Sequence, residues 1–141
     1  MVTAHTGLVF TPVVGTGNLS GALDGSWFPN RLASGHPSHQ NINEWFDPSA
    51  FAIPTSGTFG NSGRNILRDP SFANVDARIT KSFKIPLLGE GGVLQLHADG
   101  SDLFNHPNFG PPNTGIGTSG AGQITSATTS RNLQFGARFA F

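Results

Sequence analysis

The fold of this chain is decided by the stretch RNLQFGARFAF, residues 131–141. Apolar side chains occupy every second position of it, namely Leu133, Phe135, Ala137, Phe139 and Phe141. Because side chains alternate between two faces along a β-strand, the pattern predicts a strand with one apolar face. At ~3.3 Å per residue and a tilt of ~45°, such a strand covers about 25 Å of height, which matches the apolar band of an outer-membrane barrel. An amphipathic strand of a soluble sandwich is the alternative.

The composition favours a barrel wall over a charged soluble surface. Charged residues make up 11% of the 141 residues, against roughly 25% in soluble domains. Eight basic and eight acidic residues cancel, and no basic stripe is interleaved with aromatic residues, so nucleic acid is not expected as a partner. The chain has no cysteine, which excludes a disulfide framework and thiolate metal sites.

Four segments are predicted as strands, near residues 7–14, 72–85, 93–104 and 131–141. Long loops are predicted over residues 15–71 and 105–130, whereas only a short Gly-rich turn separates the second strand from the third. Long connections at one end and short turns at the other are typical of outer-membrane barrels. We therefore predict that residues 1–141 are all-β, with antiparallel strands and long loops, and form part of an outer-membrane β-barrel.

The second and third predicted strands also separate apolar from polar side chains. The second places Ala77, Ile79 and Phe83 on one face, with Lys81 as the exception. The third alternates Leu94, Leu96 and Ala98 with Gln95, His97 and Asp99, and its pattern weakens at residues 100–102. His97 and Asp99 share one face. We expect them to form a polar pair on a pore wall, near Arg78 or Asp76.

Export and barrel closure both point to a longer precursor. The first residues, MVTAHT, lack the charged and apolar regions of a signal peptide, so we expect the export signal to lie elsewhere on that precursor. Four strands do not close a barrel, for which at least about eight are needed. Because open sheet edges expose unpaired backbone groups, we expect the isolated chain to self-associate.

Five strings follow one another along the chain: WFDPSAF (45–51), GTFGNSGRNILR (57–68), FANVD (72–76), LFNHPNFG (103–110) and LQFGARFAF (133–141). Together they resemble the C-terminal barrel region of Oar-like TonB-dependent receptor/transporter proteins of the acidobacterial type. The resemblance implies a barrel of about 22 strands with an N-terminal plug, which moves a bulky ligand across the bacterial outer membrane. This chain would supply closing strands and two extracellular loops, in contact with lipid and the rest of the barrel. Two departures are Asp69, where Gly is commoner, and Gly100–Ser101, where apolar residues are usual.

Two aromatic pairs in the first long loop are the candidates for ligand binding. They are Trp27 with Phe28 and Trp45 with Phe46. Aromatic rings in a polar loop stack on sugars, so a glycan is the ligand that they suggest. Packing within the loop, or anchoring at the membrane interface, is the structural alternative.

His36 and His39 are the candidates for a metal site, with Asp47 or Glu44 as a carboxylate ligand. Solvent-exposed loop histidines are the alternative to this site, and no other cofactor is expected. Nucleophilic catalysis finds no support in the sequence, which has neither a cysteine nor a Gly-x-Ser-x-Gly elbow.

The alternative function is that of a small stand-alone β protein, which would bind carbohydrate or metal, or act as an enzyme, through its long loops. A monodisperse monomer that melts cooperatively in plain buffer would favour this alternative.

Overall fold

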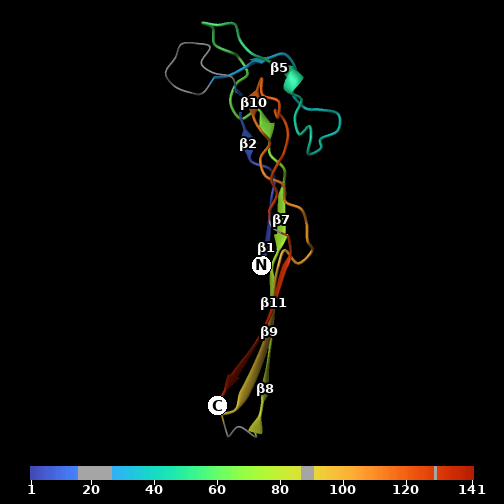
Figure 1. The fold of residues 1–141 in the computed structure, drawn as a ribbon, viewed down its shortest axis with the longest axis vertical. Helices are drawn as coiled ribbons and strands as arrows, with labels where there is room; N and C mark the ends of the chain where they lie inside the picture. Colours follow the sequence, from blue (N-terminus) through green and yellow to red (C-terminus); the bar gives the residue numbers. More distant parts are fainter. Residues whose placement is uncertain (16–26, 87–90, 129) are drawn as a thin grey trace. The chain divides into compact units, whose positions relative to one another are not determined.

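The computed structural model of the chain describes residues 1–15, 27–86, 91–128 and 130–141. These residues form eleven β-strands and one 3₁₀ helix (Figure 1), and none of their helices is long and apolar enough to cross a membrane. The chain divides into two compact units. The sheet unit comprises Met1–His5, Phe72–Asn108 and Thr128–Phe141, and the loop unit comprises Thr6–Ser71 and Phe109–Ala127. Each unit is described by itself.

The sheet unit is built on three long antiparallel strands, β8 (Ala77–Lys84), β9 (Val93–Ser101) and β11 (Asn132–Ala140). The strand order is β11-β9-β8 (Figure 1). These strands lie where the second, third and fourth strands were predicted, and the all-β prediction is confirmed. The predicted turn between the second and third strands falls partly on residues 87–90, which lie outside the described residues.

A further strand that the sequence did not predict, β1 (Val2–His5), pairs antiparallel with β7 (Phe72–Val75). The peptide between Val75 and Asp76 shows where β1 lies in the sheet. Its carbonyl accepts from Leu103 N at 2.9 Å, and its N–H donates to Met1 O at 2.8 Å. Because the two groups of one trans peptide point in opposite directions, β1 and the continuation of β9 lie on opposite edges of β7.

The third strand was predicted near residues 93–104, and in the structure β9 ends earlier, at Ser101. Gly100 is buried, and a Cβ on it would lie close to the side chains of Leu103 and Leu133, which cover the position. The strand stops at Asp102, whose φ of 50° is one that Asp tolerates better than most residues. Its carbonyl accepts from Asn105 N at 2.8 Å, which closes a turn.

The loop unit has its own hydrophobic core, made of Phe46, Ala50, Phe51, Leu67 and Ile116. The rings of Phe46 and Phe51 meet edge to face, with centroids 6.1 Å apart. Three two-stranded ladders frame this core. They pair β2 (Val9–Phe10) with β6 (Leu67–Arg68), β3 (Val13–Val14) with β10 (Gly115–Ile116), and β4 (Asn30–Arg31) with β5 (Phe51–Ala52). The β3–β10 pair is parallel.

The loop unit differs from the sequence prediction in two ways. The strand predicted near residues 7–14 is two short strands, β2 and β3, because Pro12 between them has no N–H for a ladder. Residues 15–71 and 105–130, predicted as long loops, contribute β4, β5, β6 and β10 and pack on a shared core. Residues 16–26 and 129 of these predicted loops lie outside the described residues.

The loop unit also contains one short helix among its described residues. The 3₁₀ helix η1 spans Pro48–Ala50, and the Asp47 carboxylate accepts from Ser49 N at 2.8 Å. Proline fits the first helical position because its missing N–H would have no partner there. Gly122, with a φ of 80°, passes so close to the Phe46 carbonyl that a Cβ would lie 2.7 Å from it, which fixes glycine at this crossing.

Candidate functional site

The pairing register of β8, β9 and β11 sorts their side chains onto two faces. Residues directly opposite each other on neighbouring strands share a face. One face carries the rows Ala77–Gly100–Leu133, Ile79–Ala98–Phe135, Lys81–Leu96–Ala137 and Phe83–Leu94–Phe139. The apolar sets predicted separately for the three strands therefore combine into one continuous face, with Lys81 as its only charged residue.

This apolar face has no covering layer within the described part of the chain. The exposed fraction is 73% for Ile79 and 77% for Phe135, the two residues at the ends of the same row. Phe83, Leu96, Leu133 and Phe139 are also exposed. Contiguous exposed apolar surface of this kind marks a contact with another protein or with a membrane.

The dimensions of the sheet suit a membrane. The strands β9 and β11 have 9 residues each and β8 has 8. Membrane-spanning strands are about 9–11 residues long at a tilt of about 45°. The apolar face is therefore close to the height of a hydrocarbon layer.

The opposite face of the sheet is polar. Its rows are Arg78–Asp99–Gln134, Thr80–His97–Gly136, Ser82–Gln95–Arg138 and, at the end of the sheet, Lys84–Val93–Ala140. The Arg78 guanidinium donates two hydrogen bonds to the Asp99 carboxylate, of which the one from Nη2 to Oδ2 measures 2.9 Å. His97 Nε2 lies 3.9 Å from the same Oδ2. The polar pair that the sequence predicted near Arg78 is therefore present, and Arg78 completes it.

Both outer edges of the three-stranded sheet lack a strand partner among the residues described. On one side, β8 follows β7 along the chain, but β1 pairs only with β7 and does not extend along β8. On the other side, β11 pairs with β9 alone. A bilayer does not hydrogen-bond to backbone groups, so this sheet needs further strands at both edges before it can lie in lipid.

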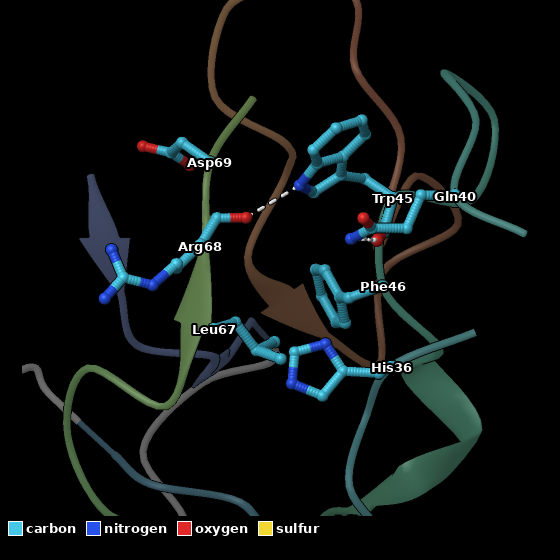
Figure 2. Close-up of a pocket in the computed structure, with 7 residues that line it drawn as sticks. All are labelled: His36, Gln40, Trp45, Phe46, Leu67, Arg68 and Asp69. Atoms are coloured by element: carbon cyan, nitrogen blue, oxygen red, sulfur yellow. Dashed lines mark hydrogen bonds between the residues drawn. The ribbon is translucent and has the colours of Figure 1, made fainter. Parts of the chain in front are cut away.

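The predicted ligand residues Trp45 and Phe46 line a cavity of about 180 Å³ in the loop unit (Figure 2). The other lining residues are His36, Gln40, Leu67, Arg68 and Asp69. Trp45 Nε1 donates to the Arg68 carbonyl at 2.8 Å, and Gln40 Nε2 donates to the Trp45 carbonyl at 2.9 Å. Phe46 is 1% exposed, so its ring belongs to the core and forms the back wall.

The other aromatic pair lies elsewhere in the loop unit. Phe28 lines a second hollow, together with Thr11 and Asn65, and Arg64 lies over the Phe28 ring at 5.8 Å from its centroid. The backbone carbonyl of Trp27 accepts from Val14 N at 2.8 Å. The structure thus assigns Trp45 and Phe28 to different hollows, and glycan binding by the four aromatic residues stays a prediction.

Two of the four predicted metal ligands, His36 and Asp47, have contacts that bear on the proposed metal site. His36 lines the cavity beside Phe46 and Leu67 (Figure 2). The Asp47 carboxylate is occupied by Ser49, whose Oγ donates to it at 2.6 Å. Across the described ranges, no group of three or more His, Asp or Glu side chains is arranged to hold a metal. Metal binding by His36 and His39 stays a prediction.

Sequence reasoning missed Asp69 as a residue of the cavity wall. Burial raises the pKa of its carboxyl above the ordinary value of 3.8. Its Oδ1 is buried and has no hydrogen-bond partner among the residues that the structure describes. A sequence signal did exist, because Asp69 occupies a position where the resemblance leads one to expect glycine.

Comparison with known proteins gives one match. Residues 1–134 match the family model of an outer membrane beta barrel domain. No curated protein and no solved structure matches the chain significantly. The matched range contains β1 through β10 and the start of β11, so it includes residues of both units.

Proposed function

Because this chain belongs to the outer membrane beta barrel domain family, we propose that it forms the C-terminal barrel segment of an Oar-like TonB-dependent receptor/transporter. Family membership makes the chain part of a barrel protein of the outer membrane. The apolar face of β8, β9 and β11 is the observation that carries the proposal. It presents Ile79, Phe135 and Phe139 outward with no cover in the described part of the chain.

In this proposal the sheet is a section of the barrel wall. The apolar face meets lipid, and the face with Arg78, His97 and Asp99 lines the interior, as lipid-facing and interior-facing residues alternate in such barrels. The open edges of β8 and β11 pair with the remaining strands of a longer precursor, which satisfies their backbone groups. The role of this segment is structural, and its interior face helps a ligand to pass.

The TonB-dependent part of the proposal is supported by the five strings between residues 45 and 141. Each string alone is a weak signal, but jointly they are specific, and they come from both units, with WFDPSAF in the loop unit and LQFGARFAF in the sheet unit. The reading frame that leads into Met1 tests this part. It should encode earlier barrel strands and an N-terminal plug, and a stop codon directly before Met1 would contradict the proposal.

The absence of cysteine from the chain allows a direct test of the wall assignment. A single cysteine is introduced on the apolar face, at Phe135 or Ile79, or on the polar face, at Gln134 or Ser82. Each variant is spin-labelled in dodecyl maltoside micelles, and collisions with oxygen and with a water-soluble nickel complex are measured. Labels at residues 135 and 79 should favour oxygen, and labels at residues 134 and 82 should favour nickel. Equal accessibility on both faces would refute a lipid-facing wall.

The loop-unit cavity favours a second candidate function, the binding of a glycan. Its volume of about 180 Å³ is that of a site for one ring-sized group, and it combines the Trp45 indole with the polar side chains of His36 and Gln40. Binding of simple sugars to the purified chain tests this function, with His36→Ala as the cavity variant and His39→Ala as its control. Loss of binding in both variants alike would argue against this cavity.

A further inference from the structure

The polar face of the sheet contains a hollow that the barrel-wall role does not explain. Its volume is about 240 Å³, and it is lined by Arg78, Thr80, Gln95, His97 and Arg138. These residues come from all three strands, since Arg78 and Thr80 lie on β8, Gln95 and His97 on β9, and Arg138 on β11. The hollow is therefore assembled by the register of the sheet.

The two arginines of this hollow differ in their partners. Arg78 is bound to Asp99 by two hydrogen bonds, so its charge is neutralised. The Arg138 guanidinium makes no hydrogen bond and no ion pair within the part of the chain that the structure describes. Asp99 is the only acidic residue in the rows of this face from Arg78 to Lys84, where Lys84 adds a further positive charge. The hollow therefore carries a net positive charge.

Gly136 shapes the hollow beside Arg138. It lies opposite His97 in the register, and a Cβ on Gly136 would collide with Cε1 and Nε2 of the imidazole. The missing side chain thus lets the imidazole lie over β11. This arrangement turns a ring nitrogen of His97 toward the strand that carries Arg138.

We propose that this hollow binds an oxyanion, namely a carboxylate or phosphate group of an anionic solute. The Arg138 guanidinium offers a planar fork of N–H donors, which suits two oxygens of one anionic group. The charge of Arg78 is balanced by Asp99, so the positive potential of the hollow comes from Arg138. Thr80 and Gln95 supply neutral donors. All five lining side chains can donate a hydrogen bond, so the set favours acceptor oxygens over a cation.

This inference deepens the proposed function, because it gives the substrate class of the interior face. It rests on that function only in treating the anion as a solute that passes through the barrel. Binding itself depends only on the sheet. In a barrel interior the bound anion would meet a positive site on the wall, and electrostatic attraction would raise its local concentration there.

Titration of the full chain in dodecyl maltoside micelles tests the inference, with inorganic phosphate in one arm and acetate in the other. Chemical shifts of the Arg138 side chain and the His97 ring report binding. Arg138→Gln should weaken the binding of whichever anion binds by about tenfold or more. Lys81→Gln removes the same charge from the opposite face of the sheet and should change the affinity by less than about twofold. Gly136→Ala displaces His97 without altering any charge and should cause a smaller loss than Arg138→Gln.

Two results would overturn the inference: no saturable binding of either anion by the unaltered chain, or equal weakening by Arg138→Gln and Lys81→Gln. Its failure is distinguishable from failure of the proposed function. If the spin labels alternate between lipid and water but neither anion binds, the barrel-wall proposal is retained and the anion site is refuted. If an anion binds but the labels do not alternate, the anion site is retained and the barrel-wall proposal is refuted.

Discussion

The loop unit and the sheet unit place the same kinds of side chain in opposite environments. In the loop unit, Phe46, Phe51 and Leu67 are buried together in a core of their own. In the sheet unit, Ile79, Phe135 and Phe139 form one face of a single sheet and are exposed. The first set is stabilised by apolar partners within the loop unit, whereas the second set has no apolar cover in the described part of the chain. The comparison separates the apolar residues that stabilise the fold of the loop unit from those that the sheet unit exposes on one face.

The two units can be observed separately. Both tryptophans, Trp27 and Trp45, belong to the loop unit, and the sheet unit contains none. Tryptophan fluorescence therefore reports unfolding of the loop unit alone. Binding to liposomes reports the apolar face of the sheet unit.

The largest effect is expected for Phe46→Ala, which opens a hole at the centre of the loop-unit core. Truncation of a buried Phe costs about 3–5 kcal/mol of unfolding free energy, through lost burial and the cavity left behind. Urea unfolding followed by tryptophan fluorescence should therefore shift to a much lower midpoint, while liposome binding is retained. Phe59→Ala is the matched control, because Phe59 is in the same unit and 80% exposed. A similar midpoint for both variants would show that the core is not what holds this unit together.

The next effect concerns the apolar face and should leave the loop unit unchanged. Phe135→Arg places a charge in the middle of that face, and a charge on the lipid side costs about 2–4 kcal/mol at the bilayer midplane. Cosedimentation with liposomes should fall accordingly, and self-association in plain buffer should decrease. Gln134→Arg places the same charge one residue away on the polar face and should bind liposomes like the unaltered chain. Equal losses in the two variants would contradict the assignment of faces.

The same contrast explains what the sequence could predict. Alternation of apolar residues is a local signal, and in β11 it needs only residues 131–141 to be recognised. The faces of the three strands then follow, because a register shifted by one residue would mix apolar and polar rows. The His97–Asp99 pair was predictable for the same reason.

The loop-unit core was not predictable from local pattern. Phe46, Leu67 and Ile116 lie far apart in the sequence, so no periodicity marks them as neighbours. The close approach of Gly122 to the Phe46 carbonyl exists only in the folded loop unit, so the sequence does not reveal it. The importance of Arg138 was hidden likewise, because it depends on a position opposite Gln95 and beside the space that Gly136 leaves.

A smaller effect is expected within the sheet unit from Asn108→Ala. Asn108 is 2% exposed, and its amide side chain accepts from Ala73 N and donates to Ala73 O, both at 2.8 Å. The variant leaves the N–H and C=O groups of Ala73 without these partners, which costs about 1–3 kcal/mol. Amide hydrogen exchange at Ala73 should accelerate, and the fluorescence midpoint of the loop unit should not move. Asn132→Ala, at an exposed position of β11, is the control, and equal acceleration in both would argue against this clamp.

The smallest effect is expected from Asp69→Asn, which probes the loop unit through its buried carboxyl. Burial raises the pKa of Asp69 in the folded state above 3.8, so the folded chain holds this proton more tightly than the unfolded chain. Its contribution to the free energy of unfolding is therefore full below pH 3.8 and is lost as the pH rises through the raised pKa. Asparagine has no such loss, so the variant should match the unaltered chain at low pH and exceed it at neutral pH, by about 0.5 kcal/mol as for other partly exposed positions.

Fluorescence-detected urea unfolding at a series of pH values measures this difference. Asp47→Asn serves as the comparison, because its carboxylate accepts from Ser49 N and Oγ and is not left unpartnered. Replacing it should destabilise the loop unit at neutral pH, which is the opposite sign. If Asp69→Asn also lowers the stability at neutral pH, then the Asp69 carboxylate has a stabilising role in the loop unit, and the charge at this cavity wall is one that the fold requires, not one that it tolerates.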